Sequence, residues 1–430
     1  MFNVITLRPT LKLWRCYVSV CLILASWCAS VTPVQSADMQ SWFDLSRWRN
    51  PNDWPFLPLP EIATDPNGDT TIGFLPVWLF TNDKNQIRQM FAPDLTYNPN
   101  LGVGGTLRFF SYPSEDTQWS VVASGAEIIA RDLDVLYSTG RTRQDSWSFD
   151  GRLRYRRDPT ERFFGIGNNS QEANETNFTT EQLFAEARLG WNLTHEMQIA
   201  VELQPRYVNI SKGAFTSLPF TRQFFPTLRE RHSNYEMLTR VLVSYDTRNS
   251  VSIPRRGMWL VAFGGLADRS LLSSVSYSVF GLEGRHYYPI GQRFTLASHA
   301  AFRYMPVGRD TPFWALSRLG GDRSDLGRRQ PLRGFGDSRF VDNNLFVANM
   351  ELRTRVLSLD LFQTHVSLEL APFVEIGRVF HSLNTNPLSH LHPVGGLGFR
   401  GIAEPFVVGY VDVGYGGEGV AVFSGIEYPF

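Results

Sequence analysis

The sequence predicts an all-β fold, a transmembrane antiparallel β-barrel of about sixteen strands. Apolar and polar residues alternate with a period of two in one segment after another, which is typical of strands with one apolar face. These segments are about 10–14 residues long, whereas strands of soluble sheets have about five or six and membrane strands need about 9–11. Beyond residue 37, no apolar run in the sequence approaches the ~18 residues of a membrane-spanning helix.

The composition excludes two classes of protein. The 430 residues contain 41 Lys and Arg against 41 Asp and Glu, so the net charge is zero and nothing suggests a basic nucleic-acid-binding face. The mean hydropathy of -0.18 excludes a polytopic helical membrane protein, which would be far more apolar. Aromatic residues make up 13% of the chain, which argues against disorder.

Residues 1–37 have the plan of a secretory signal peptide. Basic residues precede an apolar stretch over 16–29, which at about 14 residues is short for a membrane anchor, the other interpretation of this segment. Cleavage is expected after Ser30 or after Ala37. All three cysteines lie in this segment (Cys16, Cys21 and Cys28), so the mature chain has no thiol to mispair in an oxidising periplasm.

Residues 38–70 are expected to form a short N-terminal periplasmic segment that precedes a barrel over 71–430. This segment is rich in Trp and Pro, and the apolar residues between positions 42 and 48 are compatible with an amphipathic helix at the membrane surface. An unstructured linker is the alternative for the same residues.

Residues 196–209 illustrate the alternation that predicts the strands. One face carries apolar side chains, at Met197, Ile199, Val201, Leu203 and Tyr207. The seventeen segments of this kind are 71–81, 86–97, 102–112, 117–128, 131–140, 146–158, 178–191, 196–209, 235–247, 257–268, 274–288, 292–305, 344–357, 364–380, 393–403, 405–415 and 419–430. Because single-chain bacterial barrels have an even number of strands, one assignment in 71–81 or 117–140 is expected to be wrong, which leaves sixteen.

Two connections are long. They cover 210–234 and 306–343, and the second is rich in arginine and aspartate. Long connections of membrane barrels lie on the extracellular side, so both are expected there.

Several short motifs occur one after another along the chain. They are Tyr245-Asp246-Thr247-Arg248 with Pro254-Arg255-Arg256-Gly257, Leu319-Gly320-Gly321 with Leu332-Arg333-Gly334-Phe335, Glu351-Leu352-Arg353, and Phe373-Val374-Glu375-Ile376-Gly377 with Gly396-Leu397-Gly398-Phe399-Arg400. In this order and spacing the chain resembles the BamA/TamA-type family of outer-membrane barrels, the bacterial surface antigen family. The resemblance implies a location in the bacterial cell outer membrane.

The resemblance also implies a latch inside the barrel. The connection 306–343 is expected to fold back inside, so that its tip Arg333-Gly334-Phe335 reaches the wall. Alternation places Glu351 and Glu375 on inward faces, so Arg333 is expected between two carboxylates that suit its planar guanidinium. The family more often has Asp where Glu375 stands. Charge pattern alone would predict a solvated loop arginine.

The last predicted strand, 419–430, resembles the terminal signal that the barrel-assembly machinery reads. Its apolar residues share one face, at Val420, Val422, Ile426, Tyr428 and Phe430. Tyr428 and Phe430 are therefore the expected assembly signal, since the chain stops on an aromatic residue.

The function that the resemblance implies is assistance in membrane insertion or translocation of proteins or lipids. A weak seam between the first and last strands would expose an edge that templates a client strand. Family members with this role usually carry polypeptide-transport-associated domains, for which the space before the predicted barrel is too short. A gated or passive pore plugged by 306–343 is the first alternative, and an outer-membrane enzyme is the second.

The expected partners are outer-membrane lipid and lipopolysaccharide, the barrel-assembly machinery during biogenesis, and client proteins, with no nucleic acid. No cofactor, metal site or catalytic residue is expected. The sequence has no hydrolase elbow, metalloprotease motif or P-loop, and His390 and His392 lack a third ligand. His299 lies on the polar face of its predicted strand without a partner that the sequence identifies.

Overall fold

The computed structural model describes residues 56–430 apart from 64–69, 83–86, 229–232, 307–310, 327, 362–363, 385 and 405. The expected signal peptide and most of the expected N-terminal segment lie outside the described residues.

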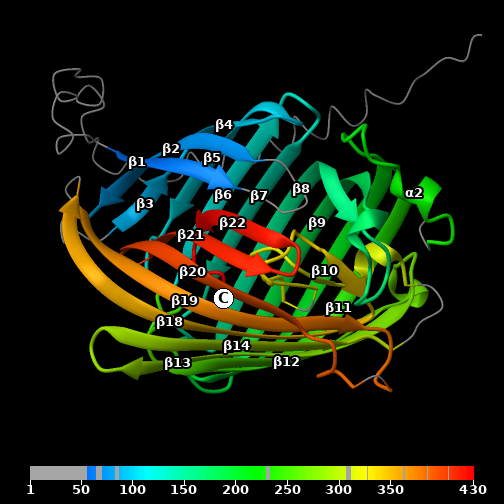
Figure 1. Cartoon of the computed structure of the whole chain (residues 1–430). Helices are drawn as coiled ribbons and strands as arrows, with labels where there is room; N and C mark the ends of the chain where they lie inside the picture. The colour runs from blue at the N-terminus through cyan, green and yellow to red at the C-terminus, as the bar shows by residue number, and fades with distance from the viewer. Residues whose placement is uncertain are drawn as a thin grey trace, which may run out of the picture. The chain divides into compact units, whose positions relative to one another are not determined.

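One antiparallel sheet dominates the described part of the chain (Figure 1). It contains β1 (Leu57–Ala63), β2 (Thr71–Thr81), β3 (Ile87–Phe91), β4 (Asp94–Asn98), β5 (Gly102–Ser111), β6 (Gln118–Ala126), β7 (Arg131–Thr139), β8 (Trp147–Phe163), β9 (Thr176–Asn192), β10 (Met197–Lys212), β11 (Ser233–Asp246), β12 (Gly257–Ala267), β13 (Tyr277–Ile290), β14 (Phe294–Tyr304), β18 (Asn344–Leu361), β19 (Thr364–Phe380), β20 (His392–Ala403), β21 (Val407–Gly416) and β22 (Gly419–Ile426). Apart from β3 and β4, strands that follow each other in the chain pair with each other in the sheet. The long connections lie between β10 and β11, which includes α2 (Thr221–Phe224), and between β14 and β18.

The prediction of an all-β architecture is confirmed, but the count of sixteen strands is not. All seventeen predicted segments contribute strands to the sheet, which has nineteen strands within the described part of the chain. Two differences explain the larger number. The predicted strand 86–97 is interrupted into β3 and β4, which share the neighbours β2 and β5, and β1 adds a strand before residue 71. The sheet therefore begins at Leu57, inside the expected N-terminal segment, because β1 pairs with β2 along its whole length.

The two faces of the sheet differ as the alternation predicts. In β10, Val201 and Leu203 are 49% and 44% exposed, whereas Glu202 between them is completely buried. We call the face with the buried polar residues the inner face and the face with exposed Leu, Val, Ile and aromatic residues the outer face. An apolar outer face of this extent fits contact with lipid.

Aromatic residues mark the outer face near one end of the strands. Trp147 and Trp191 are 57% and 51% exposed, and their rings stack with centroids 6.3 Å apart. Trp259 differs from this pair because its ring packs under Arg285, 4.9 Å from the guanidinium, and against buried apolar residues. Trp147 and Trp191 therefore lie on the outer face, whereas Trp259 packs on the inner face.

The two ends of the sheet come close to each other. β1 lies beside β22, and apolar residues of β2 and β3, such as Val77 and Met90, pack in one cluster with Val407 of β21. In addition, the rings of Tyr112 and Phe406 stack 4.6 Å apart. Within the described residues, β1 forms a ladder with β2 alone and β22 with β21 alone.

The segment between β14 and β18 packs on the inner face. Its three short strands β15 (Ser317–Leu319), β16 (Arg329–Gln330) and β17 (Phe340–Asp342) form a second sheet. Leu319, Leu332 and Phe340 are buried there in one cluster with Val347 of β18 and Phe373 of β19. We call residues 305–343 the inner segment.

Helical structure is limited to single turns in the described residues. They are the α-helical turn α2 (Thr221–Phe224) and three 3-10 turns, Glu172–Asn174, Arg269–Leu271 and Phe313–Ala315. None of these helices is long and apolar enough to cross a membrane.

Candidate functional site

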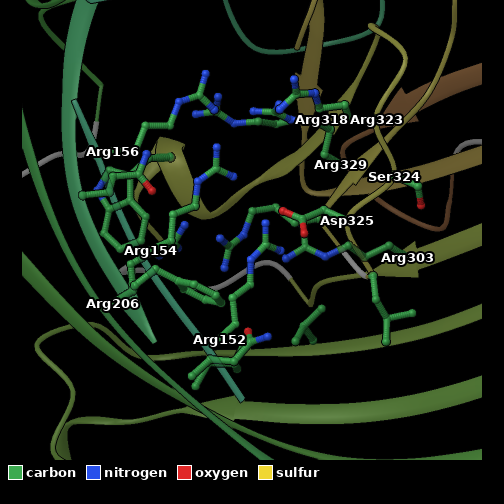
Figure 2. A pocket seen from close by; sticks show the side chains of 18 of the residues that line it. Arg152, Arg154, Arg156, Arg206, Arg303, Arg318, Arg323, Ser324, Asp325 and Arg329 are labelled. Carbon is green, nitrogen blue, oxygen red and sulfur yellow. The ribbon is translucent and has the colours of Figure 1, made fainter. Parts of the chain in front are cut away.

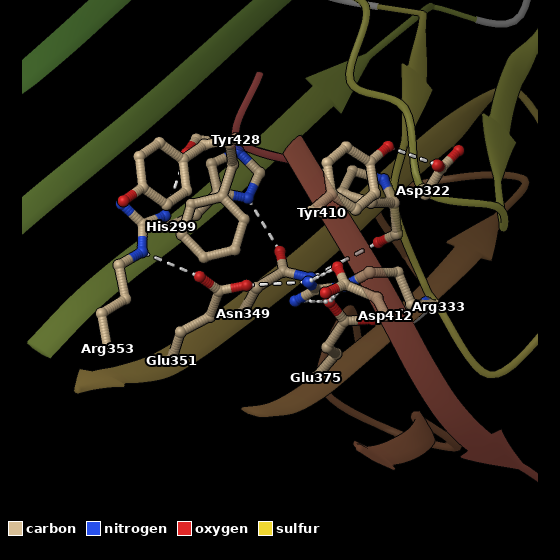
Figure 3. A network of polar contacts seen from close by, with 12 residues as sticks. His299, Asp322, Arg333, Asn349, Glu351, Arg353, Glu375, Tyr410, Asp412 and Tyr428 are labelled. Carbon is tan, nitrogen blue, oxygen red and sulfur yellow. Dashed lines mark hydrogen bonds and ion pairs between the residues drawn. The ribbon is translucent and has the colours of Figure 1, made fainter. Parts of the chain in front are cut away.

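The tip of the inner segment places Arg333 against three strands of the sheet (Figure 3). Its Nη1 donates to Glu351 Oε1 of β18 at 2.7 Å and to Asp412 Oδ2 of β21 at 2.6 Å. Its Nε donates to Glu375 Oε1 of β19 at 2.7 Å. The backbone N–H of Arg333 donates to the other oxygen of Glu375 at 2.5 Å. Arg333 thus lies between Glu351 and Glu375, with a third carboxylate beside them.

Two further arginines complete a charge-balanced cluster. Arg353 Nε donates to Glu351 Oε2 at 2.9 Å, and Arg400 Nη2 donates to Glu351 Oε1 at 2.9 Å. Arg400 also pairs with Asp412, at 3.1 Å. We call Arg333, Arg353, Arg400, Glu351, Glu375 and Asp412 the latch cluster. Its three positive and three negative charges cancel, which is the condition under which charges are tolerated in a buried site.

The guanidinium of Arg333 is held from a further side by an aromatic ring. Its central carbon lies 3.8 Å from the centroid of Phe373, within cation–π distance. Burial alone would lower the pKa of Arg333, but the three carboxylates around it raise that pKa well above its ordinary value. The carboxylates thus favour the charged form of Arg333.

Close backbone contact explains the glycines at the tip and in β21. A Cβ on Gly334 would lie 2.6 Å from the backbone N of Gly416, and a Cβ on Gly414 would collide with the carbonyl of Arg333. Only residues without a side chain permit this approach of the tip to β21. Gly414 and Gly416 therefore serve the contact with the inner segment.

Phe335 fixes the tip by apolar contact. It is 2% exposed and makes edge-on contacts with Phe340 at 5.2 Å and His392 at 5.6 Å between centroids. His392 also stacks on Phe340 at 4.0 Å, and its Nε2 lies 3.0 Å from the carbonyl of Asn168. His392 is thus engaged in packing and hydrogen bonding inside the protein.

Contacts outside the latch cluster also hold the inner segment, and two of them lie near β21. Arg339 Nε donates to both carboxylate oxygens of Glu418, at 2.7 and 2.8 Å, and its other nitrogens reach Ser170 at 2.9 Å. Tyr410 Oη of β21 donates to Asp322 at 2.6 Å. The inner segment thus contacts β21, or the turn that follows it, through Asp322, Arg333 and Arg339.

The C-terminal residues lie elsewhere than the sequence suggests. β22 ends at Ile426, and Glu427 adopts a φ of 81°, so the alternation of the strand does not continue to Phe430. Phe430 is instead 2% exposed on the inner face, where its ring stacks on His299 at 5.2 Å. Arg353 lies 3.8 Å from the ring centroid of Tyr428. Tyr428 and Phe430 therefore adjoin the latch cluster and do not share the face of Val420.

His299 has the partners that the sequence could not identify. Its Nδ1 lies 2.7 Å from Asn349 Oδ1, and its Nε2 lies 3.3 Å from Glu283 Oε1. These contacts and the stack with Phe430 hold the imidazole in place.

A comparison with protein families decides the identity of the fold. The model described as the Omp85 superfamily domain matches residues 117–399, which is more than half of the chain. This chain belongs to the Omp85 superfamily. The matched region includes Arg333, Glu351 and Glu375 and ends before Asp412.

One solved structure agrees with this assignment at the level of the fold. BamA from Haemophilus ducreyi lacking POTRA domains 1-3 is similar, with a TM-score of 0.51 and 13% identity over 82% of this chain and 74% of that one. CdiB from Escherichia coli gives a TM-score of 0.46 and 13% identity, over 87% of this chain and 63% of that one. No curated protein matches the chain significantly.

Membership of the Omp85 superfamily establishes the location and the general role. The protein is a bacterial outer-membrane β-barrel protein, and its family has a general role in insertion or translocation of proteins at that membrane. Omp85 proteins are insertases and transporters rather than enzymes.

Sequence reasoning missed Asp412 as a member of the site in this Omp85 protein. A signal was present, because Asp412 is the single charged residue in a strand of Val, Gly and Tyr, and it lies on the inner face. Arg353 and Arg400 belong to the family motifs, but their pairing with Glu351 and Asp412 depends on β18, β20 and β21 lying close together.

Substitution of Phe430 tests whether the C-terminus acts through packing. We expect Phe430→Ala to lower the free energy of unfolding of the refolded protein by about 3 kcal/mol, because a buried aromatic ring is removed. Urea unfolding in detergent measures this loss, and Phe399→Ala, at a residue 48% exposed on the outer face, is the control. Unchanged stability together with less protein in the outer membrane would instead support the assembly-signal prediction for Tyr428 and Phe430.

Proposed function

We propose that this Omp85 protein assists insertion or translocation of proteins or lipids at the outer membrane through a seam between β1 and β22. The observation that carries the proposal is that β1 pairs with β2 alone within the described residues, although β1 lies beside β22. A strand edge without a ladder offers backbone groups to which an incoming strand can add. The inner segment, held by Arg333, would keep the interior filled while the seam opens.

Two prolines support the proposal by limiting how strongly β1 can pair at this edge. Pro58 lies opposite Pro76 of β2, and since neither has an N–H, this pair cannot be a hydrogen-bonded one. Hydrogen-bonded and non-hydrogen-bonded pairs alternate along an antiparallel ladder. The backbone groups of Pro58, Pro60 and Ile62 therefore face the free edge of β1. Of these three residues, Ile62 alone has an N–H to donate there. A β1–β22 ladder would thus have few donors from β1, which favours a seam that opens easily.

Replacement of these prolines should close the seam. We expect the double variant Pro58→Val, Pro60→Val to slow client insertion severalfold, because two restored donors strengthen pairing between β1 and β22. Amide hydrogen exchange of β22 should slow in the same variant. Pro289→Val, within the paired strand β13, is the matched control. Faster insertion, or unchanged exchange of β22, would contradict a seam limited by proline.

The proposed function itself is tested by reconstitution into liposomes with an unfolded outer-membrane barrel as client. We expect the protein to accelerate conversion of the client to its folded, protease-resistant form. A photo-crosslinking residue at Ile62, which is 49% exposed on β1, should capture the client. The same residue at Leu203, which is 44% exposed in the middle of the sheet, should not. Equal capture at both positions, or no acceleration, would refute templating at the seam.

A further inference from the structure

A cavity of about 180 Å³ on the inner face is lined mainly by arginine. Ten arginines and two acidic residues contribute to its wall. We propose that this cavity binds a compact phosphate-bearing anion. The proposal concerns a site separate from the latch cluster and from the β1–β22 seam, and it stands whether or not the seam inserts proteins.

The arginines reach the cavity from opposite sides (Figure 2). Arg152, Arg154 and Arg156 project from one strand, β8, at alternating positions that share the inner face. The inner segment supplies four more across from them, among which Arg318 and Arg329 lie on β15 and β16. Figure 2 shows their guanidinium groups turned toward a common space.

Carboxylates that do not line the cavity form hydrogen bonds with some of these arginines. Asp134 receives two hydrogen bonds from Arg152, at 2.8 and 2.5 Å, and Asp132 receives two from Arg154, at 3.1 and 2.5 Å. Both aspartates lie on β7, the neighbouring strand, and neither lines the cavity. The guanidinium groups are thus oriented by acids at their side, which is the arrangement of a preformed anion site.

Positive charge remains in excess around the cavity. Arg303 of β14 is 3% exposed, and its partners are the Ser317 hydroxyl at 2.8 Å and the Ala315 carbonyl at 3.2 Å. No carboxylate among the described residues pairs with it. Glu236 is shared by two arginines, with Arg206 Nη2 at 2.9 Å and Arg328 Nη2 at 3.5 Å. Burying cations without full compensation is unfavourable, and an anion in the cavity would relieve it.

Unused donors mark where an anion could bind. The Nε atoms of Arg206, Arg303 and Arg328 are buried and lack a hydrogen-bond partner. All three residues line the cavity. Buried donors without partners are rare in proteins, so their gathering at one cavity calls for an acceptor.

Asp325 is an acidic residue that the arginines of the cavity surround. Its carboxyl lies among the arginines in Figure 2 and forms no ion pair among the described residues. Enclosure by the protein would raise the pKa of Asp325, but Arg328, with further arginines around it, lowers that pKa below its ordinary value. A negative charge is therefore favoured at this place.

Phosphate is the anion class that suits this wall best. Arginine forks match phosphate oxygens bidentately, and a phosphate carries more charge than a carboxylate. A cavity of about 150 Å³ holds a molecule the size of benzene, so this one has room for one or two phosphate groups. The phosphate could belong to a free inorganic anion or to the headgroup of a phosphorylated lipid, and the chemistry of recognition is the same.

Calorimetric titration of the refolded full chain in a neutral detergent tests the proposal. The probes are inorganic pyrophosphate and glycerol phosphate, which represent the two sources. We expect saturable binding of at least one probe, weakened by added salt. Arg303→Met should weaken it about tenfold or more, because a buried charge-assisted contact is lost without breaking an ion pair. Arg256→Gln, at an exposed turn, is the matched control and should bind as the wild type does.

The outcomes distinguish the two sources of phosphate and decide whether the proposal holds. Tighter binding of pyrophosphate supports a free inorganic anion, and tighter binding of glycerol phosphate supports a lipid headgroup. The far-ultraviolet circular dichroism and unfolding midpoint of Arg303→Met must match the wild type; if they do not, Arg328→Gln, on the inner segment, replaces it with the same expectation. The absence of saturable binding to the folded wild type, or equal losses in Arg303→Met and Arg256→Gln, overturns the proposal.

Discussion

Replacement of Arg333 by alanine is expected to release the inner segment. Removing this member of a buried charge cluster takes away the ion-pair partner of Glu375 and leaves Glu351 and Asp412 with Arg353 and Arg400. Uncompensated buried charge of this kind costs about 3–5 kcal/mol. We expect the wild type to be mostly closed in planar bilayers and Arg333→Ala to open or flicker, with a parallel loss in the free energy of unfolding.

Two companion variants make the Arg333 result specific. Arg333→Lys keeps the charge but loses the planar fork, so its conductance and stability should lie between those of the wild type and Arg333→Ala. Arg256→Ala, at an exposed turn, should behave as the wild type. If Arg333→Ala passes no current and unfolds at the same urea concentration as the wild type, the latch interpretation of Arg333 is wrong.

The second large effect is expected at Gly414, where a single methyl group should displace the tip. The Cβ of Gly414→Ala would collide with the backbone carbonyl of Arg333, so either the tip or β21 must shift. Neither is a flexible side chain that could turn away. We expect a loss of up to about 3 kcal/mol in the free energy of unfolding and increased proteolysis of the inner segment.

Gly409→Ala is the matched control on the same strand. A Cβ at Gly409 meets no atom within 4 Å, so this substitution should leave stability and proteolysis unchanged. Equal behaviour of the two alanine variants would show that the tip does not press on β21 at Gly414. Comparing the conductance of both variants with that of Arg333→Ala would then test whether the tip alone closes the interior.

Strand positions could be predicted because the signal is local. Alternation over ten or more residues reports which face of a strand meets lipid, and it needs no knowledge of neighbouring strands. In β10, the apolar residues of the predicted outward face, such as Val201 and Leu203, are exposed. The polar residues between them, such as Glu202, are buried, as the alternation predicts. β1 was missed for a related reason: its Leu-Pro-Leu-Pro sequence lacks alternation, and prolines are unusual in a strand. It becomes a strand through pairing with β2.

The latch cluster could be predicted only in part. Arg333, Glu351 and Glu375 were expected together because a family motif joins them across the sequence. Asp412 carries no such motif, and its contact with Arg333 spans 79 residues of chain. Phe430 was expected to share one face with Val420 because the predicted strand 419–430 extends four residues beyond the end of β22 at Ile426, past the positive φ of Glu427.

By itself, the sequence determined the all-β class, the position of nearly every strand, which face of each strand is apolar, and the family. These properties follow from local periodicity and short motifs, which are written in neighbouring residues. The tertiary structure alone decided which buried charges meet, that Gly414 and Gly416 admit the tip of the inner segment, and that ten arginines share one cavity. The physical reason is that a charge or a close backbone contact is specified by the distance between strands far apart in the chain, and alternation carries no information about that distance.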